Sequence, residues 1–444
     1  MTPPCRIAFL PYLGSTLLQS CVDALARTRI RAGQTRNPAI RTARLSTALA
    51  SALAGWLLLS IPAAAAVESI AVASGDGEFL VNSLVSSGAD ADVAADANGA
   101  FVVAWQSTPD TPAAFTQIAA RRYAASGSPL ADEFRVDTLG GGSFAPTMAV
   151  AAAGAFAVAW WHFDGFQIRG RRHNAAGATV GVEFIATNPP FVGLTQIGNP
   201  AIAPIFLDQM VVVWEGTSDL LRYDIAGRRI DSAGLPIGNG FLANAAFTAD
   251  HTRAAVTADA AGNYIVAWNV GSTVQGRKFT SAGVFGPPFD IATTTLGPVA
   301  LAADGPGNFV VVWGQGGMVM ARRYGSDTAP LGPAFRIDVS GSAFLPDVAS
   351  YGDGRFVVAW QKSIIGIVDV DVLARQFDAA GQPTSAELPV NTITAGSQSR
   401  PALATGAGND FVVVWTSQAP SSNETDIHGR VMGAVATIFA NGFE

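Results

Sequence analysis

The chain has 444 residues, of which 49% are hydrophobic, and 34 acidic against 27 basic residues give it a formal net charge of −7. A chain of this length and apolar content can bury a large core, which excludes extensive disorder. Only 14% of the residues are charged, and no basic stretch follows the first fifty residues, which excludes an electrostatic surface for nucleic acid.

The N-terminal segment 1–66 has the layout of a secretory signal peptide. Arg36, Arg41 and Arg44 precede an apolar run that ends at Ile61, and small residues suited to cleavage follow at 62–66. The n-region is unusually long, which leaves the true start codon open. An uncleaved membrane anchor is the alternative, although the apolar run is shorter than the roughly 20 residues that a spanning helix needs. We therefore expect a secreted or cell-surface protein, with no membrane span in the mature chain.

Cleavage after Ala66 would change the charge and the redox chemistry of the protein. It would remove seven of the 27 basic residues and one of the 34 acidic residues, which leaves a net charge of −13. Both cysteines, Cys5 and Cys21, lie before this point. The mature chain is therefore expected to be acidic, without a disulfide and without a thiolate metal site.

Downstream of the signal peptide, a five-residue apolar run that ends in tryptophan occurs seven times. Successive tryptophans are 45 to 55 residues apart, which is the signature of a structural repeat. Each run lies in a unit with four predicted strands, here called a, b, c and d, which are separated by turn residues. The first complete unit shows strand c at 118–123 and strand d at 133–137. The seven tryptophans, each at the end of a strand b, are Trp105, Trp160, Trp214, Trp268, Trp313, Trp360 and Trp415.

The composition of strand b indicates how the units pack. It is apolar at every position, so both of its faces should be buried, as in a sheet that lies between two others. Four strands per unit and seven units predict an all-β fold, a seven-bladed β-propeller of four-stranded blades over residues 67–434. Two β-sandwich domains are the alternative, but they do not explain one motif recurring seven times.

The two ends of the repeat region complement each other. The last unit supplies strands a, b and c and then stops, while a strand d of the E-F-x-V-N type appears at 78–82, before the first complete unit. We expect this N-terminal strand to complete the last blade and close the ring, which would remove an open sheet edge.

The repeat pattern also carries a family resemblance. It combines D-x-x-G-x-F-V-V-x-W, R-R-[Y/F]-D-x-x-G and E-F-x-V-N-T, and from Gly75 to about Met432 it resembles repeat units of exported bacterial propeller-like proteins. These include integrin-like and haemolysin-type calcium-binding surface proteins. The chain departs from them because Asp90-x-Asp92 and Asp369-x-Asp371 lack the continuation of a D-x-[DN]-x-[DN]-G calcium loop. We therefore expect no cofactor, and calcium is suggested by the resemblance alone.

The C-terminal tail, residues 435–444, contains the sequence I-F-A-N-G-F-E. It is similar to the I-F-x-x-G-F-E ending of many exported proteins of gammaproteobacteria, which implies a role in sorting or secretion. A frayed extension beyond the last strand is the alternative.

Most of the recurring polar and aromatic residues have a structural explanation. The seven tryptophans could stack on sugars, but their place at the end of an apolar strand favours packing between blades. An arginine recurs in every strand c and should bind a carboxylate, a carbonyl or an aromatic face. The four histidines lack a metal-type spacing, and no G-x-S-x-G elbow is present. The recurring arginines are Arg121, Arg171, Arg228, Arg277, Arg322, Arg375 and Arg430.

A candidate binding face follows from loop lengths. Strands alternate in direction, so the b–c and d–a connections share one face of the ring, and the b–c connections vary most in length. One of them contains Trp161, His162, Phe163, Asp164 and Phe166, a combination that suits sugar or peptide recognition. Alternatively, these aromatic residues fill the gap to the next blade.

Two functions remain open. The first is an exported, non-enzymatic binding or interaction module at the cell envelope or outside the cell, whose partner is a polysaccharide or a surface protein. The alternative is a polysaccharide hydrolase or lyase, in which Asp164 and the next loop's Glu215 and Asp219 supply acid and base. We assign Glu215 and Asp219 to the candidate binding residues and assign no catalytic or metal-binding residue.

Overall fold

The computed structural model describes residues 77–433 apart from 83–85, 110–114, 152, 188–194, 218–221, 246–248, 294–296, 364–368, 407, 421 and 423. All of the described residues belong to the compact unit Val67–Glu444. The expected signal peptide and the C-terminal tail lie outside the described residues.

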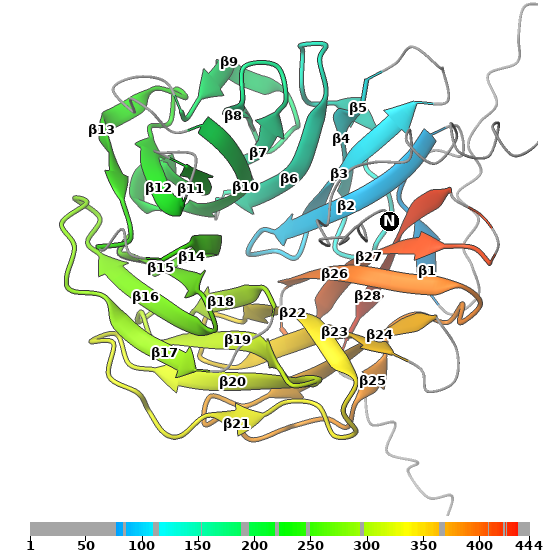
Figure 1. Ribbon diagram of the computed structural model, residues 1–444. Helices are drawn as coiled ribbons and strands as arrows, with labels where there is room; N and C mark the ends of the chain where they lie inside the picture. Colours follow the sequence, from blue (N-terminus) through cyan, green and yellow to red (C-terminus); the bar gives the residue numbers. More distant parts are fainter. Residues whose placement is uncertain are drawn as a thin grey trace, which may run out of the picture. The chain divides into compact units, whose positions relative to one another are not determined.

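Seven four-stranded antiparallel sheets form the blades of a propeller, which confirms the predicted fold (Figure 1). Blades 1 to 3 consist of β2 (Ser86–Ala95), β3 (Phe101–Pro109), β4 (Gln117–Tyr123) and β5 (Phe134–Arg135); β6 (Ser143–Val150), β7 (Phe156–His162), β8 (Gln167–His173) and β9 (Thr179–Ile185); and β10 (Thr195–Pro204), β11 (Met210–Thr217), β12 (Tyr223–Ile230) and β13 (Pro236–Leu242), with the short 3₁₀ turn η1 (Phe206–Asp208) between β10 and β11.

Blades 4 to 7 repeat the arrangement. They consist of β14 (His251–Ala258), β15 (Tyr264–Val270), β16 (Thr273–Phe279) and β17 (Phe289–Thr293); β18 (Val299–Ala303), β19 (Phe309–Gln315), β20 (Met318–Tyr324) and β21 (Phe335–Arg336); β22 (Ala343–Ser350), β23 (Phe356–Ser363), β24 (Val370–Phe377) and β25 (Leu388–Pro389); and β26 (Ser397–Thr405), β27 (Phe411–Gln418), β28 (Thr425–Met432) and β1 (Glu78–Leu80).

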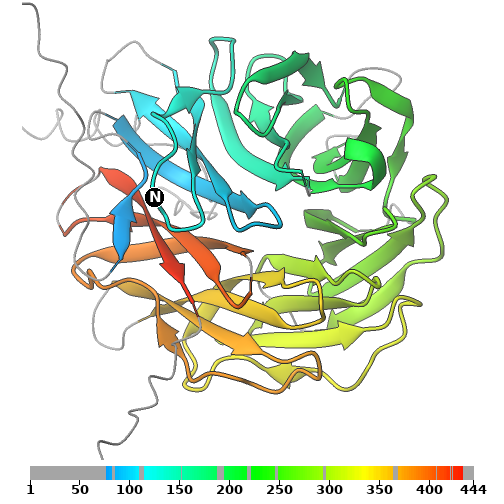
Figure 2. The ribbon, with the colours of Figure 1, turned by 180° about the vertical axis from the view of Figure 1, so that it is seen from behind.

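Strand a of each blade is the innermost strand. The strands a of consecutive blades contact one another around the whole ring, and β26 contacts β2 to close it (Figure 2). They line a central channel of about 240 Å³ whose wall includes Val93, Met148, Ile202 and Leu403. We call the side with the a–b and c–d turns the turn face, and the side with the b–c and d–a connections the loop face.

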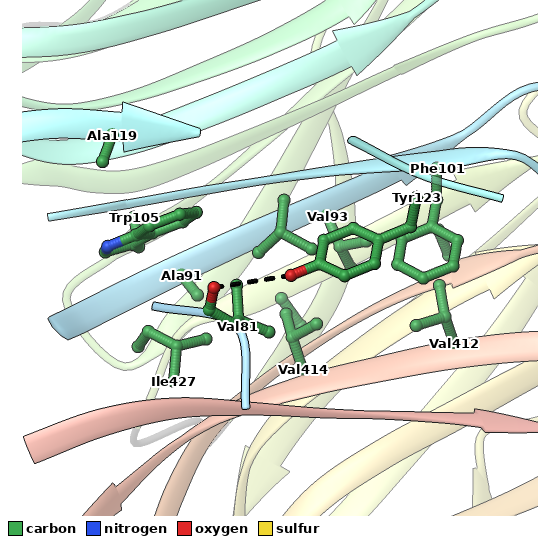
Figure 3. Close-up of a cluster of buried hydrophobic side chains, with 13 residues drawn as sticks. Val81, Ala91, Val93, Phe101, Trp105, Ala119, Tyr123, Val412, Val414 and Ile427 are labelled. Carbon is green, nitrogen blue, oxygen red and sulfur yellow. Dashed lines mark hydrogen bonds between the residues drawn. The ribbon is translucent and has the colours of Figure 1, made fainter. Parts of the chain in front are cut away.

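The tryptophans of strand b lie between blades, as expected. All seven are at most 2% exposed. Figure 3 shows one interface, in which Trp105, Phe101 and Tyr123 of blade 1 pack against Val412 and Val414 of blade 7. The core is therefore seven apolar layers between neighbouring sheets rather than one central cluster.

The N-terminal strand closes the ring as predicted. Strand β1 pairs with β28, and the backbone N–H of Val81 donates to the carbonyl of Ile427 at 2.8 Å. The buried carboxylate of Glu78 accepts hydrogen bonds from the N–H and hydroxyl of Thr392 at 2.8 and 2.6 Å, and it contacts His428 Nδ1 at 3.0 Å. Residues more than 300 positions apart in the sequence thus share one blade.

Several of the recurring arginines donate to a backbone carbonyl of the preceding blade: Arg121, Arg171, Arg277, Arg375 and Arg430. Arg375 donates to the carbonyl of Ile337, the residue after strand d of the preceding blade, at 2.9 Å, and its guanidinium lies 5.7 Å from the ring centre of Phe377. The second arginine of the R-R pair reaches in the other direction, since Arg323 donates to the carbonyl of Ala380 in the following blade at 2.5 Å. In blades 1 and 2 the two arginines of the motif tie the blade to both of its neighbours, in agreement with the carbonyl partners expected.

Candidate functional site

The candidate loop lies on the loop face of blade 2. Trp161 and His162 are the last two residues of β7, so the connection itself is only Phe163–Phe166. The N–H of Phe166 donates to the carbonyl of Phe163 at 3.1 Å, and the N–H of Phe163 donates to the carbonyl of Gly142 at 2.9 Å. The loop is thus a tight turn fixed to the preceding d–a connection.

A row of four aromatic rings runs through this loop, and we call it the aromatic ridge. Phe144 lies 5.3 Å from Trp161, Trp161 lies 6.0 Å from Phe163, and Phe163 lies 5.7 Å from Phe166. The planes of successive rings are inclined by 38°, 78° and 52°. Phe144 and Trp161 are half-buried, whereas Phe163 and Phe166 are 50% and 48% exposed. The ridge therefore rises from the blade interface to the surface.

Asp164 stands at the tip of the same turn. Its side chain is exposed and packs against Gly141, where an added Cβ atom would collide with the carboxylate. Nearby cationic groups are already paired, since Arg169 binds Glu183 at 2.8 Å and Arg135 binds Asp137 at 3.1 Å. Asp164 is consequently the negative charge that the aromatic ridge presents to solvent.

His162 is buried and belongs to a structural contact. Its Nδ1 lies 3.3 Å from Ser143 Oγ, and the Ser143 hydroxyl donates to Asp137 Oδ2 at 2.9 Å. Burial and the nearby Arg169 lower the pKa of His162, so the ring is neutral at pH 7. A catalytic triad needs the carboxylate on the histidine and the hydroxyl at the surface, but here the buried serine bridges the other two groups.

Glu215 joins blades 3 and 4. Its carboxylate accepts hydrogen bonds from Asn199 Nδ2 at 2.6 Å and from the backbone N–H of Arg253 at 2.7 Å. Burial raises the pKa of Glu215, although these two hydrogen bonds act to lower it. Gln361 holds the corresponding position in blade 6 and accepts from the N–H of Arg400 at 3.2 Å. Asp219, the other expected acidic residue, lies outside the described residues.

The loop face carries one feature that we did not expect from the sequence. Six strands a have a bulge at which a residue other than glycine adopts a positive φ of 45° to 55°. The bulges ring the channel on the loop face, where Asp90 and Arg400 form an ion pair. The proline that follows four of these residues is the sequence signal that could have indicated them. The six residues are Asp90, Ala145, Asn199, Arg253, Leu345 and Arg400.

Two carboxyl groups lie deeper on the channel wall. Asp92 Oδ2 accepts a hydrogen bond from the N–H of Met148 at 2.7 Å, and Asp347 Oδ2 accepts one from the N–H of Leu403 at 2.8 Å. Burial raises the pKa of Asp92 to about 6; burial and the nearby Asp92 charge raise the pKa of Asp347 to about 7. Within the described residues, no group of three His, Cys, Asp or Glu side chains is placed to hold a metal ion.

The part of the chain that the structure describes contains no helix that is long and apolar enough to cross a membrane. No protein-family model matches the sequence, and no curated protein matches it. The similarity of this chain to known proteins is therefore seen in the comparison of structures.

A protein of unknown function from Dyadobacter fermentans has a similar structure, with a TM-score of 0.51 and 13% identity over 81% of this chain and 98% of that one. A puromycin hydrolase matches with a TM-score of 0.50 and 14% identity over 78% of this chain. The match covers 53% of the hydrolase, so the chain spans about half of that enzyme's length.

An α-L-arabinanase from Penicillium chrysogenum matches with a TM-score of 0.45 and 13% identity over 80% of this chain and 98% of that one, a likeness too low to carry an argument. At sequence identities this low, the similarity concerns the fold alone. The chain is a seven-bladed β-propeller whose last blade is built from both ends of the propeller sequence.

Proposed function

We propose that the protein is an exported, non-enzymatic binding module that acts at the cell envelope or outside the cell through the aromatic ridge on its loop face. The observation that carries the proposal is the exposure of Phe163 and Phe166 on a turn that is fixed by backbone hydrogen bonds. Exposed, rigidly held aromatic side chains are the usual anchors of binding surfaces. The signal-peptide pattern supports the location.

The shape of the aromatic ridge favours a surface protein over a polysaccharide. Successive rings are inclined by 38° to 78° and present edges and corners, whereas flat stacking on sugar rings needs exposed faces. Apolar side chains of a protein segment fit between such rings, and Asp164 suits a lysine or arginine beside them. A polysaccharide remains the second candidate partner.

The hydrolase or lyase alternative finds less support. A pair of catalytic carboxyl groups must flank one bond. Asp164 packs on the connection between blades 1 and 2, while both oxygen atoms of Glu215 accept hydrogen bonds, one within blade 3 from Asn199 and one from Arg253 of blade 4. The raised pKa of Glu215 is explained by its burial in this interface.

The test compares binding and turnover in the same samples. The purified protein is incubated with insoluble bacterial and plant polysaccharides and, separately, with immobilised purified envelope proteins; we score retention and the release of reducing ends. The variant carries Phe163→Ser and Phe166→Ser. The matched control is Phe115→Ser, because Phe115 is 64% exposed on the same face of blade 1.

Retention on an envelope protein that falls at least tenfold in the double variant, and not in the control, would support the proposal. Retention on a glycan with the same dependence would make the polysaccharide the partner. Release of reducing ends that is abolished by Asp164→Asn or Glu215→Gln would overturn the proposal in favour of the enzyme.

A further inference from the structure

The turn face carries a second unusual surface, in blade 3. In five blades the turn between strands a and b places glycine with positive φ at its fourth position: Gly99, Gly154, Gly262, Gly307 and Gly354. Blade 7 uses Gly408, with φ of 70°, at the third position. Blade 3 has no glycine in this turn, and instead Leu207 and Asp208 adopt φ values of 59° and 57°.

This backbone is strained. A left-handed conformation is unfavourable for a residue other than glycine, asparagine or aspartate, because the Cβ atom approaches the following carbonyl oxygen. The strain therefore falls chiefly on Leu207. The side chains gain no burial in return, because Leu207 is 69% exposed and Phe206 is 54% exposed. A glycine at position 207 would remove strain, so folding alone does not explain the sequence of this turn.

The surrounding turns fix this segment in place. Buried Arg172 of blade 2 donates from one nitrogen to the carbonyls of Asp208 at 2.5 Å and Asp231 at 3.1 Å. The a–b and c–d turns of blade 3 are thereby held side by side. Phe206 packs directly on Gly262 of blade 4, where an added Cβ atom would lie 2.7 Å from the Cβ of Phe206.

The neighbouring turns extend the apolar surface. In the c–d turns of blades 3 and 4, Leu235 and Val284 are 58% and 66% exposed, and Phe285 follows Val284. Arg229 connects these two turns, since it donates to the carbonyl of Ser281 at 2.6 Å. We call Phe206, Leu207, Leu235, Val284 and Phe285 together the blade 3–4 surface.

The charges that this surface presents to solvent are negative. Asp208 is exposed at the tip of the strained turn, and Asp231 and Asp259 begin the adjacent turns. Arg172 and Arg229 beneath them are engaged with carbonyls, and the largely buried Arg277, whose guanidinium lies 4.2 Å from the ring centre of Phe285, donates to the carbonyl of Gly286. Carboxylates around an apolar patch repel anionic lipid and attract cationic side chains.

We propose that the blade 3–4 surface binds a segment of a partner protein that carries apolar side chains flanked by lysine or arginine. This site lies on the face of the ring opposite the aromatic ridge. The protein would then bridge two partners, one on each face. The proposal does not depend on the function assigned to the aromatic ridge, because the two surfaces share no residue.

The test uses a fluorescein-labelled twelve-residue peptide of leucine and lysine as the probe, and a second peptide in which glutamate replaces lysine. Fluorescence anisotropy measures binding to the wild-type protein and to Leu207→Gly. A melting curve is recorded for each protein. Leu331→Gly is the matched control, because Leu331 is 50% exposed beside the corresponding c–d turn of blade 5.

We expect Leu207→Gly to bind the lysine peptide at least tenfold more weakly and to melt roughly 1–2 °C higher, since glycine relieves the strain. The control should bind normally, and the glutamate peptide should not bind. Equal binding by Leu207→Gly, or equal affinity for both peptides, would overturn the proposal. Dimerisation of the wild-type protein that Leu207→Gly abolishes would also overturn it, because the occupant would then be a second copy of the chain.

Discussion

Asn82 and Asp426 lie 344 residues apart and are joined by a hydrogen bond of 3.0 Å from Asn82 Nδ2 to Asp426 Oδ1. The same amide accepts a hydrogen bond from the N–H of Ile427 at 2.6 Å. Where a blade has this Asn–Asp pair, the hydrogen bond between the two side chains joins the end of strand d to the start of strand c. In blade 6, Asn391 Nδ2 donates to Asp371 Oδ1 at 2.8 Å. In blades 1 and 5 an aspartate replaces the asparagine, and an arginine two residues earlier binds it, as Arg336 binds Asp338.

The first prediction concerns ring closure. Asn82→Ala removes the acceptor of the buried Ile427 N–H and the donor to Asp426, so the free energy of unfolding should fall by roughly 1–3 kcal/mol. Thermal melting measures the effect. Asn98→Ala, at an exposed position in a turn, is the control and should melt like the wild-type protein. If Asn82→Ala has the same melting temperature as Asn98→Ala, the pair of Asn82 and Asp426 does not hold the ring closed.

The second prediction concerns charge in the blade 6 pair. Asn391→Asp places a second carboxylate against Asp371, so the melting temperature should fall at pH 8. Adding Asp371→Gln should restore most of the loss, because blade 1 combines Asp137 with Gln117 at the corresponding positions. A double-mutant cycle of melting curves measures the coupling. Additive effects of the two changes would contradict the interpretation.

The third prediction concerns pH. The pKa of Asp347 is raised to about 7, so its contribution to stability is complete below the pKa of an unfolded aspartate, about 4, and is lost as the pH rises through 7. Asp347→Asn should therefore raise the melting temperature at pH 8 and bring no gain at pH 4.5. Melting curves across this range test it. Hydrogen bonds, chiefly from Arg336, hold the pKa of Asp338 below its usual value against burial, so Asp338→Asn should instead lose stability at pH 8. A gain from Asp347→Asn that does not vary with pH would contradict the assignment.

The fourth prediction separates two kinds of tryptophan. Trp360 is fully buried between blades 5 and 6, so Trp360→Ala should cost roughly 3–5 kcal/mol of unfolding free energy. Trp161 is half-buried in the aromatic ridge, so Trp161→Ala should cost less stability and weaken binding at the loop face. Denaturant unfolding and the retention assay distinguish them. Equal losses of stability would place Trp161 in the core.

The sequence was sufficient for the architecture because each repeat carries its own copy of the evidence. Seven apolar runs ending in tryptophan located every strand b, and the missing strand d after β28 predicted the role of β1. The structure extends strand b past the tryptophan, however, so that Trp161 and His162 belong to β7. Strand ends depend on where the hydrogen-bonded partner strand stops, which spacing within one repeat does not show.

The candidate site was only partly visible in the sequence. Trp161, Phe163 and Phe166 do gather in one row, but His162 turns inward to Ser143, and Glu215 holds Arg253 of the next blade. Both outcomes depend on which residue of the adjoining blade lies opposite. The strain at Leu207 likewise arises from the hydrogen bonds that close its turn.

The sequence by itself determined the number of blades, their order and the closure of the ring. The reason is that recurring strands that are apolar on both faces are buried when each sheet lies between two sheets of the same kind. Only the tertiary structure decided which polar residues face solvent and which link blades. That choice is made by contacts between consecutive repeats and between residues as distant as Asn82 and Asp426.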